Sequence, residues 1–99
     1  MNDKIKNPDT DYLFEAILSL RDVEECYRFF DDLCTVAELG EMSKRLRAAR
    51  MLEANQQYSD IVELTGLSTA TISRVKRCLK YGSDGYTLAL ERMSRPDEQ

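Results

Sequence analysis

Side chains able to recognise a ligand are concentrated in one short stretch, from Gly66 to Leu79. Hydroxyl-bearing residues come first and cations follow, with no acid between them. Short hydroxyl groups can hydrogen-bond to base edges, and lysine and arginine can neutralise phosphates. A solvated basic helix in an unrelated bundle would look similar. The residues that we predict to contact DNA are Ser68, Thr69, Ala70, Thr71, Ser73, Arg74, Lys76, Arg77 and Lys80.

The same inventory disfavours an enzyme and a metal site. The chain has no His and no glycine-rich phosphate loop, and Asp31 and Asp32 are adjacent on a predicted helix, where neighbours point to different faces. Cys26, Cys34 and Cys78 lack a CxxC spacing, so we expect small buried hydrophobic residues and not zinc ligands. We predict no catalytic residue, no bound metal and no cofactor.

The distribution of charge favours a nucleic-acid partner, although the formal net charge is −4. Residues 1–41 hold eleven acids and four bases, residues 42–80 hold three acids and eight bases, and residues 81–99 hold four acids and two bases. A basic segment between two acidic ones is expected when one face approaches phosphate and the others do not.

Apolar residues recur at helical spacing along the whole chain, and no stretch alternates as a strand does, so we predict an all-α fold. Asp9 or Thr10 could cap the first helix. The apolar stripe of this helix consists of Leu13, Phe14, Ile17, Leu18 and Leu20.

Two capping boxes predict where the next two helices begin. In a capping box, the first side chain accepts a bond from the first helical turn and an acid three residues later reaches back. Asp22 with Glu25 opens the second helix, and Thr35 with Glu38 opens the longest helix, which runs to about Ala54. The side chains of this longest helix that we expect to face inward are Leu39, Met42, Leu46, Ala49 and Leu52.

A helix-turn-helix is predicted downstream. It consists of a short helix over 59–65, a turn at Gly66 and a helix that Ser68 caps and that ends near Tyr81. Glycine suits the turn because it adopts the left-handed conformation without strain. Thr65 fills a core position less well than an apolar residue would. The core between the two helices is predicted to contain Ile61, Leu67, Ile72 and Val75.

The chain is long enough for about one domain, so residues 1–99 are predicted to form a single domain. Within it we assign 10–54 to core and dimerisation helices, 58–81 to the helix-turn-helix and 84–94 to a C-terminal helix. Two short N-terminal helices cannot bury all their large apolar side chains within themselves. These could pack on the rest of the chain or on a second copy, and we favour the second copy because paired readers gain affinity and spacing selectivity.

Several of these segments resemble a known family. Leu33 to Leu39, Lys44 to Arg47 and Ala70 to Arg74 resemble stretches of the tryptophan repressor, in the same order and at nearly the same separations. Cys26 to Cys34 and Ser73 to Leu79 are more similar to the YerC/YecD branch of Trp-repressor-like bacterial proteins. The resemblance implies six helices and an intertwined homodimer in which the N-terminal helices of two chains interlock.

The repressor's ligand site is matched only in part. By resemblance, Arg45 and Arg74 correspond to the two arginines that sandwich the indole of tryptophan, and Thr35 to a nearby residue of the partner chain. Val75 stands where the repressor has glycine, and Cys78 where it has serine. The branched side chain would intrude on the indole, and a thiol is a poorer hydrogen-bond partner. We therefore expect no tryptophan cofactor, and phosphate contacts or intramolecular pairs for the two arginines in place of an effector pocket.

These patterns predict a sequence-specific DNA-binding transcription regulator, a repressor by resemblance, that acts as a homodimer on double-stranded DNA. The alternative is a protein-interaction module whose apolar N-terminal helices and basic segment bind other proteins. No charged leader precedes an apolar stretch, and no apolar run approaches the ~20 residues that span a bilayer. We therefore expect a cytoplasmic protein with no membrane partner.

Overall fold

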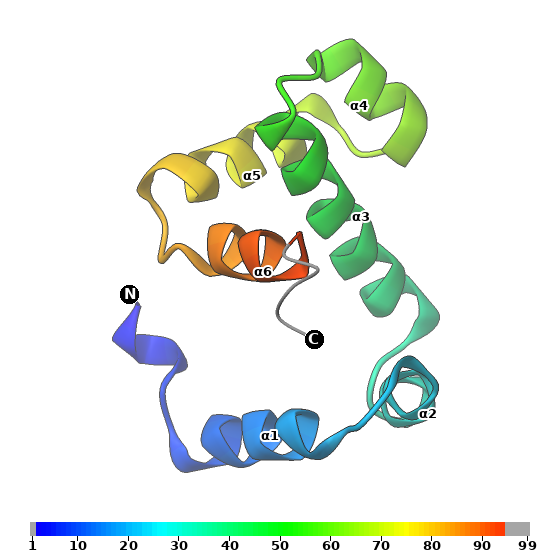
Figure 1. Ribbon diagram of the computed structural model, residues 1–99, viewed down its shortest axis with the longest axis vertical. Coiled ribbons are helices and arrows are strands. Elements are labelled where there is room, and N and C mark those ends of the chain that lie inside the picture. Colours follow the sequence, from blue (N-terminus) through cyan, green and yellow to red (C-terminus); the bar gives the residue numbers. More distant parts are fainter. Residues whose placement is uncertain (1, 95–99) are drawn as a thin grey trace. The chain divides into compact units, whose positions relative to one another are not determined.

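The computed structural model describes residues 2–94, and the regular structure in that part of the chain is entirely helical, as predicted (Figure 1). Two compact units, Met1–Leu39 and Gly40–Gln99, are described separately below. The six α-helices are α1 (Pro8–Ser19), α2 (Val23–Leu33), α3 (Val36–Glu53), α4 (Tyr58–Thr65), α5 (Thr69–Tyr81) and α6 (Gly85–Met93), preceded by a 3-10 turn at Asp3–Ile5.

Helix α1 begins earlier than the sequence suggested. Its N-cap is Asn7, whose side-chain oxygen accepts a hydrogen bond from the Thr10 backbone N–H at 2.8 Å. Pro8 fills the first helical position, where its missing N–H costs nothing. The predicted caps Asp9 and Thr10 are therefore wrong, because both residues already lie inside the first turn.

Both predicted capping boxes are present. Asp22 accepts from the Glu25 N–H at 2.8 Å, while the Glu25 carboxylate accepts from the N–H of Arg21, one residue earlier than a standard box. Thr35 and Glu38 are fully reciprocal, with bonds of 2.9 and 3.1 Å. The backbone N–H and hydroxyl of Thr35 hold the pKa of Glu38 below its usual range.

The N-terminal unit leaves its apolar side chains in solvent. Among residues 2–39 every side chain is exposed or only half-buried. Leu18 is 83% exposed and Val36 is 89% exposed, and Phe14 is also exposed. The expected packing of this stripe within the chain is therefore wrong, because α1 and α2 offer no buried site for it.

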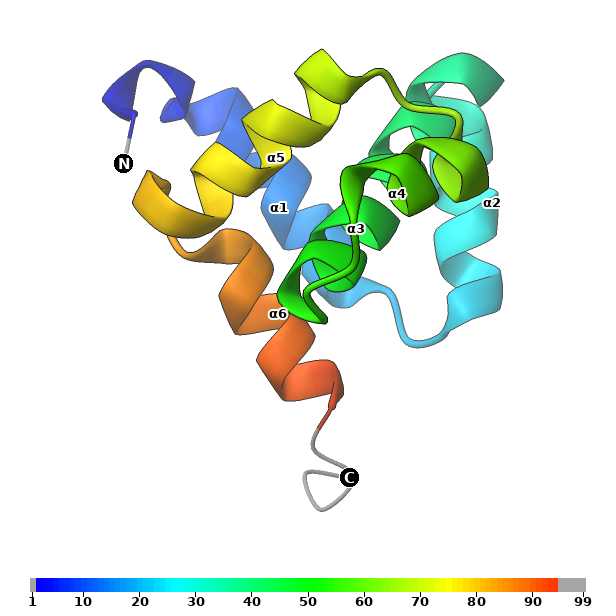
Figure 2. The ribbon, with the colours of Figure 1, turned by 90° about the horizontal axis from the view of Figure 1, so that it is seen from above.

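The second unit has a compact core where three helices meet. Its cluster of buried residues contains Ala48, Met51, Ile61, Leu67 and Ile72. The C-terminal half of α3 thus packs against α4 and α5, and the small side chain of Ala48, which is fully buried, allows a close approach. Figure 2 shows α4 beside this part of α3, with α5 leading away from the turn.

The predicted core between α4 and α5 is confirmed. Ile61, Leu67, Ile72 and Val75 are all at most 5% exposed. On α3 the prediction was less accurate, because Ala49 is buried while Met42 and Leu46 lie at the surface. These two side chains occupy turns of α3 that come before the contact with α4.

The turn between α4 and α5 is closed by polar groups as well as by glycine. Gly66 has φ 75° and ψ 5°, and its N–H donates to the Val62 carbonyl at 2.8 Å. The buried Thr65 hydroxyl donates to the Ile61 carbonyl at 2.6 Å and accepts from the Leu67 N–H at 3.1 Å. Thr65 therefore suits its core position, contrary to the expectation from the sequence.

Helix α6 follows α5 after a short link and returns beneath it (Figure 1). It begins after Asp84, which has φ 63°, and its Thr87 hydroxyl donates to the Glu53 carboxylate of α3 at 3.5 Å. Its bounds agree with the predicted 84–94 segment. Within residues 2–94, every helix is too short or too polar to span a bilayer.

Replacing Thr65 by valine removes the hydroxyl while keeping the shape of the side chain. The buried Leu67 N–H then loses its acceptor, which we expect to lower the free energy of unfolding by about 1–3 kcal/mol. Thr65→Ser is the control, because it keeps both hydrogen bonds and loses only a methyl group. Urea denaturation at one protein concentration measures both variants, and equal losses would show that the methyl group matters more than the hydroxyl.

Candidate nucleic-acid interface

The exposed face of α5 is set by the two side chains that the helix buries. Ile72 and Val75 point into the core, so the residues about half a turn away point outward. With 3.6 residues per turn, the outward stripe runs through Ala70, Ser73 and Arg77. All three are exposed, and so are their neighbours Thr69, Arg74 and Lys80.

Two of the predicted contact residues also serve the start of the helix. Ser68 is the N-cap of α5, and its hydroxyl oxygen accepts from the Thr71 N–H at 3.1 Å. The same hydroxyl donates to the Thr71 side-chain oxygen at 3.1 Å, and Thr71 is half-buried. Their hydroxyls are therefore partly occupied, whereas Thr69, Ala70 and Ser73 are exposed and take no part in this cap.

Lys76 lies at the edge of the exposed face, on the side that approaches α4. Its ammonium nitrogen is 5.6 Å from the ring centroid of Tyr58, the first residue of α4. Tyr58 was not predicted, because nothing in the spacing of the sequence connects the first residue of one helix with the middle of the next. The contact depends on the angle that the core imposes between α4 and α5.

Tyr81 is a second residue that the sequence analysis missed. It is the last residue of α5, one turn after Arg77, and 83% of its side chain is exposed. Large aromatic groups are uncommon in such positions without a partner. The available sign was an aromatic residue directly after Lys80 in a stretch without acids.

The residues that match the repressor's ligand site lie in different surroundings. Thr35 is the cap residue before α3, Arg45 is half-buried in α3, and Arg74 is exposed on α5. Val75 is 2% exposed. Cys78 is exposed, so its predicted burial is wrong, while Cys26 and Cys34 are half-buried. The prediction that tryptophan is not a cofactor stays a prediction.

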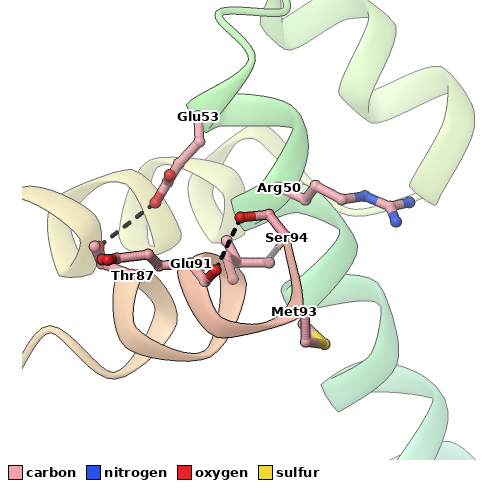
Figure 3. Close-up of a pocket in the computed structure, with 7 residues that line it drawn as sticks. Arg50, Glu53, Thr87, Glu91, Met93 and Ser94 are labelled. Carbon is pink, nitrogen blue, oxygen red and sulfur yellow. Dashed lines mark hydrogen bonds between the residues drawn. The ribbon is translucent and has the colours of Figure 1, made fainter. Parts of the chain in front are cut away.

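A pocket of about 550 Å³ lies between α3 and α6 (Figure 3). Glu53 points toward Thr87 across it, whereas the Arg50 guanidinium extends away from the α6 side chains. A neighbouring pocket of about 290 Å³ is lined by Ser43, Leu46, Arg47, Arg50, Leu90 and Met93. Neither pocket includes the residues that match the tryptophan site.

Helix α3 also supports the end of α4. The Arg47 guanidinium donates to the Leu64 carbonyl at 3.3 Å, which satisfies a carbonyl left free where α4 ends. Metal ligation has less support, because no group of three or more His, Cys, Asp or Glu residues gathers within residues 2–94. The exposed, basic α5 is thus the surface on which the core, the cap and the α4 contacts converge.

An all-α chain in which a three-helix core carries an exposed basic helix has the architecture of the Trp-repressor-like fold, and solved structures confirm this class. A structure from Staphylococcus aureus, described as a candidate Trp repressor, matches with a TM-score of 0.89 and 51% identity over 94% of each chain. A TrpR-like protein from Eubacterium eligens ATCC 27750 matches with a TM-score of 0.89 and 51% identity, over 93% of this chain and 95% of the other.

The sequence gives the same result. The family model described as Trp repressor protein matches residues 9–94, and the chain belongs to this family. The uncharacterized protein YerC of Bacillus subtilis (strain 168) is 54% identical over 97 residues, which is 98% of this chain and 93% of YerC. The predicted family and the six-helix fold are therefore confirmed.

The conformation of Gly66 yields a test of how the turn positions α5. No atom lies within 4 Å of a Cβ added at Gly66, so an alanine there is penalised only by the left-handed backbone. We expect Gly66→Ala to lower the free energy of unfolding by about 1–2 kcal/mol, and Gly66→Asn by less because asparagine tolerates this conformation better.

Gly85→Ala is the matched control, since its Cβ also meets open space and its φ is not positive. Urea denaturation should show little change for it. A loss as large as that of Gly66→Ala would show that the left-handed backbone is not the cause.

Proposed function

We propose that this protein is a DNA-binding transcription regulator that acts as a homodimer and reads DNA with α5 of each subunit. The observation that carries the proposal is the exposure of α5, a helix with cations and no acids that the α3–α4–α5 core holds away from its own buried face. Membership of the Trp repressor family supports the same function.

The order of side chains along α5 suits this role. Thr69, Ala70 and Ser73 are exposed near the start of the helix, where the N-terminal residues of a recognition helix approach base edges. Arg77 and Lys80 follow and would reach phosphates. Ser68 and Thr71 would contribute mainly by fixing the first turn, because their hydroxyls already bond to each other.

Dimerisation is supported by the N-terminal unit. A unit of about 40 residues with no fully buried side chain gains little hydrophobic stabilisation by itself, since each Å² of apolar surface removed from water contributes about 25 cal/mol. A second copy would cover Leu18 and Val36 on this unit. It would also cover Met93 of α6, which is 66% exposed. Two α5 helices would then enter successive major grooves about 34 Å apart.

The basis for an effector is weaker than the basis for DNA binding. Arg74 is exposed on the same face as Ser73 and Arg77, which favours a phosphate contact over a ligand clamp. We therefore assign Arg74 to the DNA surface and leave tryptophan out of the proposed mechanism. Val75 and Cys78, which replace the repressor's glycine and serine by resemblance, support that choice.

Selection of bound sequences from a random DNA pool, with and without a panel of amino acids, tests the proposal and provides the probe for single variants. We expect a palindromic enriched site. On that site, Arg77→Ala should reduce the slope of log Kobs against log salt by about 0.9, because one phosphate contact is lost.

Arg28→Ala is the control for Arg77→Ala, since Arg28 is also exposed but lies on α2 among acids. Its salt slope should equal that of the unmodified protein. If no sequence is enriched at any salt concentration, the regulator hypothesis is rejected. An enriched site whose salt slope is unchanged by Arg77→Ala would instead remove Arg77 from the interface.

The dimer makes a separate prediction for sedimentation velocity. The protein should sediment as a dimer at low micromolar concentration, and Leu18→Glu should shift it to monomer by placing a charge on a surface that the second copy covers. Leu64→Glu is the control, because Leu64 is 54% exposed on α4, outside the proposed dimer surface. A monomeric parent protein would favour the interaction-module alternative.

A further inference from the structure

We infer that Tyr58 is a positioning residue, which holds the Lys76 ammonium where one DNA phosphate would lie. The inference rests on the proposed DNA binding and adds to it a residue of α4. Its structural basis is the 5.6 Å separation between the Lys76 nitrogen and the centre of the Tyr58 ring.

The Tyr58 ring is held in place by the core. It is half-buried and packs against the cluster formed by Ala48, Met51, Ile61, Leu67 and Ile72. Its backbone is fixed as well, because it is the first residue of α4 and the next two turns of that helix pack on the same cluster. The ring is therefore a fixed platform, whereas a lysine side chain alone has four flexible bonds.

The ring attracts the ammonium through its negative face. Such a contact is worth about 0.5–1 kcal/mol at an exposed site, and it leaves the hydrogen-bonding protons of the ammonium available. Lys76 is exposed, so a phosphate can approach it without displacing the ring. Without the ring, binding would have to immobilise one of the side chains that lose most rotamer entropy on ordering.

The position of the pair agrees with how the two helices meet DNA. In a helix-turn-helix, the second helix lies in the major groove and the first helix crosses the sugar-phosphate backbone. Lys76 lies on the edge of α5 that faces α4, and Tyr58 lies at the first residue of α4. A phosphate crossing α4 would meet Lys76 at this edge, while Arg77 on the outward stripe would meet a different one.

A double-mutant cycle on the selected DNA site tests the inference. Lys76→Ala should reduce the salt slope by about 0.9, as expected for one phosphate contact. Tyr58→Leu should weaken binding by about two- to fivefold, the factor that corresponds to one exposed cation–π contact. Tyr58→Phe keeps the ring and should bind as the parent protein does.

The coupling between the two positions decides the outcome. In a Lys76→Ala background, Tyr58→Leu should have no further effect, whereas in an Arg77→Ala background it should retain its full effect. If Tyr58→Leu weakens binding equally in all backgrounds, it acts through the packing of α4 and the inference is wrong. It is also wrong if Lys76→Ala leaves the salt slope unchanged.

A measurement without DNA separates this inference from the proposed function. The NMR signals of the Lys76 side-chain methylene protons should be shifted upfield by the ring current in the parent protein and in Tyr58→Phe, and should lose that shift in Tyr58→Leu. Absence of the shift in the parent protein would overturn the inference even if DNA binds. Failure of the parent protein to bind any DNA would reject the proposed function first.

Discussion

The packing of α3 on α4 and α5 is the constraint on which the rest of the second unit depends. Ala48 is small and fully buried, so α3 can come close enough for Ile61, Leu67 and Ile72 to share one core. A larger side chain at Ala48 would have to displace these residues, because protein interiors are close-packed. The angle between α4 and α5, the outward stripe of α5 and the Lys76–Tyr58 contact all depend on this packing.

The features predicted correctly from the sequence were mostly local. A cap such as Thr35 with Glu38 depends on residues three apart, and a glycine at position 66 between two periodic segments indicates a left-handed turn without knowledge of the fold. The α4–α5 core was also predictable, since Ile61 and Ile72 repeat with the period of their helices.

Features that depend on contacts between distant residues were missed. Burial of Leu18 cannot be decided from periodicity, because an apolar stripe shows that a partner is needed and does not say which chain supplies it. The role of Thr65 depends on which carbonyl and which N–H the turn brings to its hydroxyl. Tyr58 and Lys76 likewise come together only through the crossing of two helices.

The hydroxyl of Thr65 has a consequence for the energetics of recognition. By bonding to Ile61 and Leu67 on either side of Gly66, it fixes the turn before any ligand arrives. The conformational entropy of orienting α5 is thus lost during folding and does not have to be lost again during association. A preorganised helix of this kind discriminates between ligands by how well they fit one fixed geometry, since it has little freedom to adapt to a poor match.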